Sequence, residues 1–544
     1  MNRKDGSMKS ELLYSGRLTP RIMKRIVLHS ALIFSMVFTL LLLPAGCSSE
    51  QGGDKHEDEA FMQKYEAPAK KLEHISLKFY FPGEEPKRWP EVKAEIEKRS
   101  LDSVNASLDF KWFDYGRYIS VMRTLDASGL AFDAFCVSKP ESIFPNFTTL
   151  AKEGMLTDIT ALFPENAQAL YSRYKHDELE YAKVDGKLYA IPALYPDAYC
   201  SCLKADDTLC TKYNISKITN LDQYEAYLKA VKDNEPQLIP GIITIGVNSM
   251  KLFAGIMGYT ILDEYQNLVY KRDDPKMKIK AWEQTPEFLE LANKLIEWYR
   301  KGYLKFDADP AKVTSFVLFG ELEPLPEEPQ RMSLPSESGE FIQSNPLRVF
   351  NLYSGQKAQR DNPMGSSYET GALVFPSSSS NTARALRFLD WVQQDRDNYY
   401  LMMYGIENED YVLKDNHLKL PQGVDFDSTY MNWDGSRAFR NVEYEPSPRK
   451  DAYGPGINSH SDFIDRYTEL PPHGAFYPDY SKLKDAAEKR INAIIEFDTS
   501  LLKGEIKDFG EVTKFIDDMK ALGIDNLVAR TQTQLDKWIG KAPQ

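Results

Sequence analysis

The 544-residue chain has few of the residues, and none of the short motifs, that commonly mark an enzyme active site. It contains seven histidines and five cysteines. It lacks the H-E-x-x-H motif of zinc proteases, the G-x-S-x-G turn of serine hydrolases and the glycine-rich loops that bind nucleotide phosphates. No acidic loop of the calcium-binding type is present either. We therefore expect no metal ion and no cofactor, and the pattern favours binding over catalysis.

An excess of positive charge is also missing. The chain carries 67 Lys and Arg against 80 Asp and Glu, a net charge of −13. A nucleic-acid-binding protein needs a basic patch or stripe, so this balance argues against a nucleic-acid partner. Apolar residues make up 42% of the chain, which is enough for sizeable cores, and the length suits two or three domains.

The first 47 residues have the pattern of a bacterial lipoprotein signal peptide. Three basic residues between positions 21 and 25 precede an apolar run over 26–43, and small residues lead to Cys47 in "LLLLPAGCSSE". The match is imperfect, because Pro44 stands where a leucine is usual. An uncleaved membrane anchor is the alternative, since the run is about long enough to span a bilayer.

Cleavage before Cys47 would leave a lipidated cysteine that anchors the protein to the extracellular face of a bacterial cell membrane. Residues 1–46 would then be the signal peptide, and 47–72 a flexible polar tether. The removed segment holds seven Lys and Arg and two Asp and Glu, so the remaining chain would carry a net charge of −18.

Four further cysteines are consistent with export, where disulfides can form. They could pair in three ways, and their spacing does not choose among these. Free buried thiols are an equally good interpretation, and C-x-C without a nearby histidine is a weak metal signal. These residues are Cys136, Cys200, Cys202 and Cys210.

Hydrophobic periodicity predicts strands that alternate with helices, as in an α/β protein with a parallel sheet. Asn220 and Thr285-Pro286 stand where helix caps are expected. Leu413 to Tyr480 is rich in loop-forming residues, and Leu483 to Ile539 has a helical pattern. The predicted strands include 74–81, 106–116, 132–138 and 186–194, and the predicted helices include 91–99, 221–231, 287–302 and 381–392.

Aromatic residues are plentiful, with 31 Tyr, 28 Phe and 7 Trp. In an open α/β sheet, ligands bind beyond the carboxyl ends of the strands. Flat aromatic faces suit sugar rings, whose C–H faces stack while their hydroxyl groups need hydrogen bonds. Each aromatic taken alone is as easily a half-buried core residue. Four of them fall on predicted strand-to-helix loops: Trp89, Tyr115, Tyr195 and Trp433.

Six segments carry a likeness to a known family through their order and spacing. They are "LDASGLAFDAF", "AKEGMLTDIT", "VDGKLYAIPAL", "TPEFLELANKLIEWYRKGYL", "ALRFLDWV" with "MMYGIENEDYVL", and "MKALGIDNLVARTQTQLDKW". Between Ile75 and Trp538 the chain resembles the extracellular solute-binding lipoproteins (family 1 type) of bacterial ABC sugar importers. One departure is Phe132, where the family more often has proline.

The resemblance implies an α/β fold of two lobes joined by a hinge, the type 2 periplasmic-binding-protein-like fold, with the ligand in the cleft between the lobes. The first lobe would comprise 73–195 and 372–410, and the second lobe 196–371 and 411–544. The resemblance also implies a monomeric receptor without enzymatic activity. Such a receptor would bind a carbohydrate of oligosaccharide size and deliver it to an ABC permease.

Residues that face the ligand would come from the loops after the first-lobe strands and from the second lobe. Trp89 and Trp433 would stack on sugar faces. Asp197 and Arg437 would bind hydroxyl groups through charge-assisted hydrogen bonds. The full set implied by the resemblance is Trp89, Asp114, Tyr115, Ser138, Lys139, Tyr195, Asp197, Trp433, Asp434 and Arg437.

Three alternatives stay open. A surface glycoside hydrolase needs two carboxylates about 5–10 Å apart in one cleft, such as Asp114 and Asp197. A structural or adhesive lipoprotein needs no working cleft. A receptor for a peptide or another non-sugar solute would share the whole fold.

Overall fold

The computed structural model describes residues 72–540, apart from short gaps. The described residues belong to one compact unit, which begins at Lys71. The predicted signal peptide, Cys47 and the tether up to residue 71 lie outside the described residues. No helix in the described part of the chain is both long enough and apolar enough to cross a membrane. The gaps are at 115–116, 119–120, 123, 125–131, 138–146, 195–198, 244–248, 322–329, 336–340, 353–356, 361, 365–370, 415–416, 432–437 and 446–459.

The buried apolar side chains form two separate clusters, and we call the parts of the chain around them the first and the second lobe. The first cluster takes its residues from 77–191 and 364–439. The second takes its residues from 203–352 and 476–535. The chain therefore leaves the first lobe after 191 and returns to it after 352. Its last fully buried residue in the first core is Phe439, and Leu470 and Tyr477 still pack against that core from outside.

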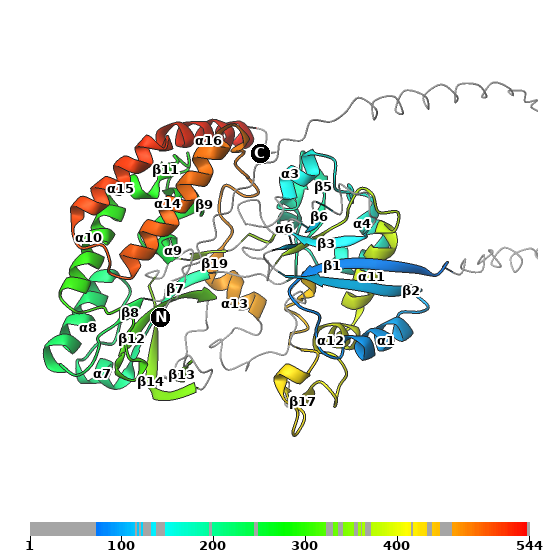
Figure 1. The fold of residues 1–544 in the computed structure, drawn as a ribbon, viewed down its shortest axis with the longest axis horizontal. Coiled ribbons are helices and arrows are strands. Elements are labelled where there is room, and N and C mark those ends of the chain that lie inside the picture. Colours follow the sequence, from blue (N-terminus) through cyan, green and yellow to red (C-terminus); the bar gives the residue numbers. More distant parts are fainter. Residues whose placement is uncertain are drawn as a thin grey trace, which may run out of the picture. The chain divides into compact units, whose positions relative to one another are not determined.

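The first lobe contains a five-stranded sheet (Figure 1). Its strand order is β2-β1-β3-β16-β6, with β1 parallel to β2 and β3. The returning strand β16 is antiparallel to both β3 and β6. Strands β1, β2, β3 and β6 consequently all end at the same edge of the sheet. The bounds are β1 Ile75–Pro82, β2 Ala106–Phe113, β3 Ala134–Val137, β6 Ala190–Ile191 and β16 Ala372–Val374.

Helices cover this sheet through aromatic contacts that follow from the period-2 pattern of the strands. Phe79 and Phe110 are register partners on β1 and β2, and their rings stack at 5.1 Å. Phe388 of α11 meets Phe79 edge-on at 5.6 Å. The helices of this lobe are α1 Trp89–Arg99, α3 Phe147–Lys152, α4 Leu162–Asn166, α5 Gln168–Tyr171, α6 His176–Glu180, α11 Thr382–Gln394 and α12 Arg396–Tyr404.

The first lobe extends beyond the predicted boundary at residue 410. Tyr411, Tyr430 and Phe439 are buried in its core, although the prediction gave 411–544 to the second lobe. Tyr430 stacks near Trp89 at 6.3 Å, and Phe439 lies 5.9 Å from Phe81 at the end of β1. The segment also carries a hairpin. Its strands are β17 Val412–Lys414 and β18 His417–Lys419. A second small hairpin of the first lobe pairs β4 Lys183–Val184 with β5 Lys187–Leu188.

The turn in the second hairpin has a local cause in the sequence. Asp185 and Gly186 join β4 to β5 as a two-residue loop, with φ angles of 50° and 80°. Left-handed backbone at both central positions is what a type I′ turn requires, and Asp-Gly is a favoured pair for it. The chain then runs through β6 toward the second lobe.

The second lobe holds another five-stranded sheet, in the order β13-β14-β7-β12-β8. Strand β7 is antiparallel to β12 and β14, while β12 is parallel to β8. A three-stranded antiparallel sheet, β11-β10-β9, accompanies it. The bounds are β7 Tyr199–Asp206, β8 Ile242–Ile243, β9 Tyr259–Asp263, β10 Leu268–Lys271, β11 Lys280–Ala281, β12 Ser315–Glu321, β13 Gln330–Pro335 and β14 Phe341–Asn351.

Two long helices of this lobe confirm the predicted caps. Asn220 accepts a hydrogen bond from Gln223 N at 2.9 Å at the start of α8, and Thr285 accepts one from Phe288 N at 3.2 Å at the start of α10. The helices of the second lobe are α7 Asp207–Lys212, α8 Leu221–Asn234, α9 Ser249–Ile256, α10 Pro286–Arg300, α14 Lys484–Leu502, α15 Phe509–Ala521 and α16 Ile524–Ile539.

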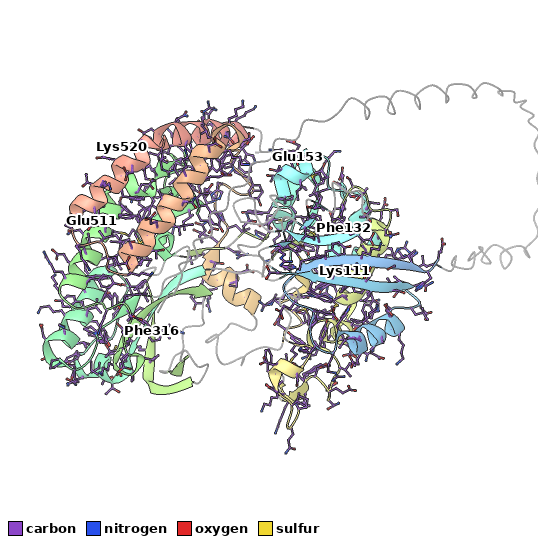
Figure 2. All side chains as sticks on the ribbon, viewed as in Figure 1. Lys111, Phe132, Glu153, Phe316, Glu511 and Lys520 are labelled. Atoms are coloured by element: carbon purple, nitrogen blue, oxygen red, sulfur yellow. The ribbon has the colours of Figure 1, made fainter. Side chains whose placement is uncertain are left out.

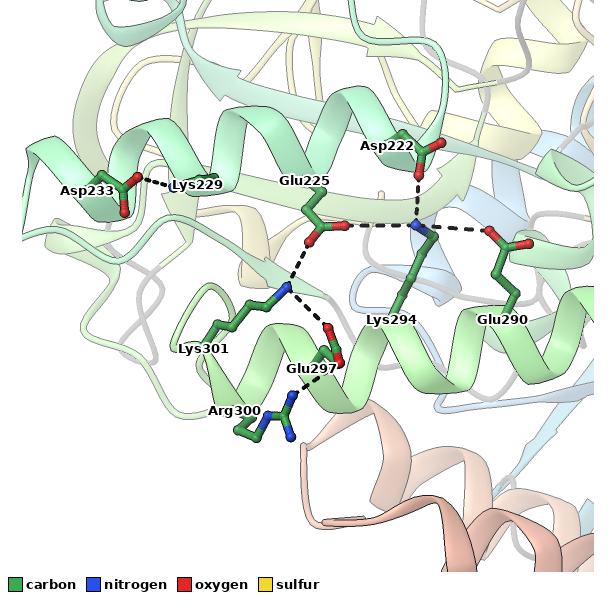
Figure 3. A network of polar contacts seen from close by, with 9 residues as sticks. All are labelled: Asp222, Glu225, Lys229, Asp233, Glu290, Lys294, Glu297, Arg300 and Lys301. Carbon is green, nitrogen blue, oxygen red and sulfur yellow. Dashed lines mark hydrogen bonds and ion pairs between the residues drawn. The ribbon is translucent and has the colours of Figure 1, made fainter.

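Ion pairs join α8 to α10 along their exposed sides (Figure 3). Lys294 of α10 contacts Asp222 of α8 at 2.7 Å and Glu225 at 3.8 Å. Lys301 reaches Glu225 and Glu297, both at 3.2 Å. Exposed ion pairs contribute little one by one, so this network supports a contact that the buried stripe of each helix already makes.

The C-terminal helices are part of the second lobe. Arg490 of α14 pairs with Glu283 at 3.0 Å, and both side chains are fully buried. Arg490 also donates to the carbonyl oxygen of Gln266 at 3.0 Å. Burial raises the pKa of Glu283, and the charge of Arg490 opposes that rise. The pair therefore fixes α14 to the turn between β9 and β10 and to the short helix Trp282–Gln284.

Candidate ligand-binding site

The predicted ligand-facing residues follow strands that end at one edge of the first-lobe sheet. Asp114 comes directly after β2, and Ser138 comes directly after β3. The ends of β1 and β2 are joined by a hydrogen bond from Gly83 N to Phe113 O at 2.9 Å. This edge is where an α/β sheet binds its ligands. The predicted residues Tyr115, Ser138, Lys139, Tyr195 and Asp197 themselves lie outside the described residues.

Asp114 is the predicted polar residue that the structure describes at this edge. Its side chain is exposed, and its carbonyl oxygen accepts hydrogen bonds from Arg117 N and Tyr118 N, both at 2.9 Å. These bonds fix the backbone of Asp114 just beyond the end of β2. This placement suits hydrogen bonding to a ligand at the edge of the sheet.

Trp89 lies in the core of the first lobe, and its side chain is 5% exposed. The near-parallel rings of Phe110 and Tyr430 lie 4.8 and 6.3 Å away, and Trp112 meets it edge-on at 5.4 Å. Protein rings thus occupy the space that a sugar would need. The predicted stacking of Trp89 on a ligand is therefore at odds with this structure.

Trp112 is a further site candidate, which lies within the predicted strand 106–116 and was not among the predicted ligand-facing residues. It is half-buried near the end of β2, two residues before Asp114. Its ring packs against Phe81 at 6.0 Å and against Trp89. The signal that could have identified it is its position, because Trp112 is the last of the alternating positions 106, 108, 110 and 112 and lies close to the carboxyl end of β2.

Two predicted ligand-facing segments are joined at their described flanks. Leu194, just before Tyr195, forms a parallel bridge with Asn441, and its carbonyl oxygen accepts a hydrogen bond from Val442 N at 2.9 Å. Asn441 is 1% exposed and donates its side-chain amide to Gln393 Oε1 at 2.8 Å. The chain after the predicted residues Trp433, Asp434 and Arg437 is therefore anchored to the end of β6. Those three residues lie outside the described ones.

A charged cluster lies next to this join. Arg440 donates to Glu445 at 2.9 Å, and the hydroxyl groups of Tyr399 and Tyr404 donate to the same carboxylate at 3.0 and 3.2 Å. Burial, together with the charge of Glu445, raises the pKa of both tyrosines. Both phenols therefore stay protonated and act as donors. Sequence spacing did not indicate this cluster, because its members come from two segments, α12 and residues 440–445, that are well separated in the chain.

Phe132 is a large aromatic residue where proline was noted above as more common in the family that the sequence resembles. Its ring stacks on Tyr80 of β1 at 4.9 Å and meets Phe135 edge-on at 5.5 Å, and it is 1% exposed. Figure 2 labels Phe132 among the side chains of the first lobe. A proline at this position could not fill that space. Phe132 is accordingly a core residue just before β3, and it is closed to a ligand.

A small cavity opens beside the same join. Its lining includes Tyr174, Pro192, Leu194 and Phe439. It has room for about one water molecule, so a sugar cannot fit inside the lobe at this point. In the described part of the chain, no group of His, Cys, Asp and Glu side chains is arranged to hold a metal ion.

The cysteine alternatives are resolved for two residues. Cys136 and Cys210 are buried free thiols, and burial raises the pKa of each to about 12. Such thiols are inert at neutral pH. Cys200 and Cys202 lie on β7, and their side chains lie outside the described ones.

A family described as a domain of unknown function (DUF3502) matches residues 472–540. These residues are the C-terminal helices that pack into the second core. A relative from Streptococcus pneumoniae, named as a carbohydrate ABC transporter substrate-binding protein, is 21% identical over 476 residues. The match covers 85% of this chain and 91% of the relative.

Solved structures share the fold over nearly the whole described chain. The N-glycan transport solute-binding protein NgtS of S. pneumoniae superposes with a TM-score of 0.62 at 17% identity, covering 86% of this chain and all of that one. FusA of S. pneumoniae in complex with kestose gives 0.52 at 14% identity, covering 86% and 99%. An HMO-binding, ABC-transporter-associated solute-binding protein of Bifidobacterium longum infantis gives a TM-score of 0.52 at 13% identity, also covering 86% and 99%. The predicted fold is confirmed: the chain has the two-lobe α/β, periplasmic-binding-protein-like fold of ABC-transporter solute-binding proteins.

Proposed function

We propose that this protein is a solute receptor of a bacterial ABC importer and that it binds an oligosaccharide. The observation that carries the proposal is the two-lobe fold, shared over 86% of the chain with a protein whose structures contain Man1GlcNAc and Man5GlcNAc. The similar protein of S. pneumoniae, which is named as a carbohydrate ABC transporter substrate-binding protein, supports the proposal. The receptor binds its ligand, leaves it chemically intact and delivers it to a membrane permease.

The ligand contacts the carboxyl edge of the first-lobe sheet. Trp112 offers part of an aromatic face at this edge, and the exposed carboxylate of Asp114 lies two residues away. The remaining contacts come from residues outside the described ones: Tyr115, Ser138, Lys139, Tyr195, Asp197, Trp433, Asp434 and Arg437. An aromatic face with carboxylate acceptors beside it suits a neutral sugar, whose C–H faces stack and whose hydroxyl groups donate.

Cys47 carries the lipid that holds the receptor at the extracellular face of the cell membrane. The polar tether after it separates the anchor from the folded unit that begins at Lys71. The receptor acts as a monomer. Metabolic labelling with a radioactive fatty acid tests the anchor, with the Cys47→Ala chain as its control. Equal label on both chains, or no label on either, would contradict lipidation at Cys47.

A glycan panel tests the binding function. The full chain, solubilised in detergent, is titrated with Man5GlcNAc, kestose, milk oligosaccharides and an unrelated peptide, and tryptophan fluorescence is recorded. We expect a saturable change for one glycan class, none for the peptide, and an unchanged glycan by mass spectrometry. A response to the peptide alone would replace the carbohydrate with a peptide ligand. Glycan cleavage would identify a glycoside hydrolase instead.

A further inference from the structure

Two segments that cross between the lobes are joined to each other. Strand β15, Ala358–Gln359, pairs in parallel with β19, Thr468–Glu469, and Arg360 N donates to Glu469 O at 2.7 Å. Helix α13, His460–Tyr467, leads directly into β19. We call residues 357–360 and 460–469 the hinge unit. Its two parts are about a hundred residues apart in sequence, yet their pairing makes them move together.

The hinge unit is attached to the second lobe through backbone-like hydrogen bonds. The side-chain amide of Gln359 accepts from Ile261 N at 2.8 Å and donates to Ile261 O at 3.0 Å. Ile261 belongs to β9, so the amide continues the hydrogen-bonding pattern of that strand. Arg272 of the second lobe also donates to Lys357 O at 3.1 Å.

Asp465 is held in place by its own hinge unit. Its carboxylate accepts from Arg360 Nη2 at 2.7 Å, and its carbonyl oxygen accepts from Lys357 Nζ at 2.8 Å. Arg360 is fixed in turn by a bond to Thr468 Oγ1 at 3.1 Å, and its side chain is 10% exposed. A rotation of the first lobe leaves these contacts unchanged, because all of their members belong to the hinge unit.

The same carboxylate reaches across to the first lobe. Lys175 Nζ lies 3.0 Å from Asp465 Oδ2 and 3.3 Å from Oδ1. Lys175 precedes α6, and the following residues Leu179 and Tyr181 are buried in the first core. Both charged side chains are about half exposed, at 52% and 46%. The nearby contact from Tyr477 Oη to Tyr181 O, at 3.0 Å, is neutral and does not respond to salt.

We propose that the Lys175–Asp465 ion pair is a salt-sensitive latch between the first lobe and the hinge unit, which biases the equilibrium between arrangements of the two lobes. Asp465 is supported on the hinge side, so lobe rotation makes or breaks its bond to Lys175 alone. An exposed pair of this kind shifts such an equilibrium by about two- to fivefold, or about 0.4–1 kcal/mol. The latch acts without ligand, so it goes beyond the proposed binding function.

The test measures an interlobe distance in the full chain. Fluorophores are placed at the exposed positions Lys98 and Lys484 through non-canonical amino acids, which leaves the cysteines untouched. We expect Lys175→Met to shift or broaden the distance distribution, and Lys175→Glu to do so more strongly. We expect 0.5 M NaCl to have the same effect on the wild type, because salt screens exposed charges, and to have none on Lys175→Met.

The matched control is Lys187→Met. Lys187 pairs with Asp158 at 3.2 Å, with similar exposure of 59% and 35%, but both residues belong to the first lobe. Its distance distribution should stay that of the wild type. If Lys175→Met and Lys187→Met give the same distribution, or if salt leaves the wild type unchanged, the latch does not exist. Neither result depends on ligand, so a failure of the latch is separate from a failure of the receptor function.

Discussion

Two ion pairs in this protein use the same chemistry in opposite settings. Arg490 and Glu283 lie 3.0 Å apart, and both side chains are fully buried. Lys175 and Asp465 also lie 3.0 Å apart, but about half of each side chain is exposed. A buried pair that loses one member leaves a charge without water, whereas an exposed pair exchanges its partner for water at little cost. The buried pair should therefore stay formed in the folded protein, whereas the exposed pair can form and break at little cost.

The largest effect should follow from breaking the buried pair. We expect Arg490→Met to lower the free energy of unfolding by about 3–5 kcal/mol, because Glu283 stays buried without its partner. Urea unfolding followed by circular dichroism measures this. The neighbouring exposed Lys489→Met is the control, and it should be neutral. The double variant with Glu283→Gln should recover much of the loss; if it does not, packing rather than charge explains the effect.

Trp89 and Trp112 also differ in burial, and we expect their substitutions to affect different properties of the protein. Trp89 is buried, so Trp89→Ala should cost about 3–5 kcal/mol of stability. Trp112 is half-buried, so Trp112→Ala should cost less stability but weaken glycan binding by about two- to tenfold. Urea midpoints and glycan titrations measure the two quantities. Phe306→Ala, an exposed second-lobe aromatic, is the binding control. Unchanged affinity in Trp112→Ala would remove Trp112 from the site.

The ion pairs of Lys294, which join α10 to α8, are intermediate in burial between the two pairs compared above. The Lys294 side chain is 19% exposed and contacts three carboxylates, those of Asp222, Glu225 and Glu290. We expect Lys294→Met to lower the free energy of unfolding by about 0.5–1 kcal/mol, more than an isolated surface pair and less than Arg490. Urea midpoints at low and high salt should converge for the wild type and the variant. If the variant loses stability by the same amount at low and high salt, the cause is lost packing of the aliphatic part of the Lys294 side chain.

The smallest effect concerns pH. Burial alone would raise the pKa of Asp465, but hydrogen bonds from Lys175 and Arg360 outweigh it and lower that pKa below its usual value. A lowered carboxylate pKa stabilises the fold above the unfolded pKa of about 3.9 and ceases to do so as pH falls through the folded value. The latch should therefore be constant between pH 6 and 8 and weaken below pH 4. Asp177, Glu178 and Arg360 also lie near Lys175 or Tyr181. Interlobe distances measured as a function of pH test this expected pH dependence. The control is Asp465→Asn, which should show no such dependence.

Much of the fold could be predicted because its signals are local. The alternation in β1, the Asp185-Gly186 turn and the caps at Asn220 and Thr285 each depend on a few neighbouring residues. The boundary at 410 was wrong, because the segment around Tyr430 and Phe439 has no helical or strand period to follow. Its place is set by rings at Phe81 and Trp89, more than three hundred residues away.

The carboxyl edge of the first-lobe sheet was predictable, whereas the exposure of the residues at that edge was not. Parallel strands bring Asp114 and the residues after β3 to one edge, and the strand pattern alone predicts that. Whether an aromatic at the edge is free for a ligand depends on what packs against it. Trp89 is covered by Phe110 and Tyr430, and no short stretch of sequence contains that information.

The sequence by itself determined the α/β order, the turns and helix caps, the acidic balance and the absence of common catalytic motifs, since each of these follows from residue type and spacing over a few positions. Only the tertiary structure decided which aromatics are core, where the first lobe ends, which charge pair is buried, and that Arg360, Asp465 and Lys175 meet. The physical reason is the same in every case: burial and pairing are properties of contacts between distant segments, and those contacts exist only once the chain has folded.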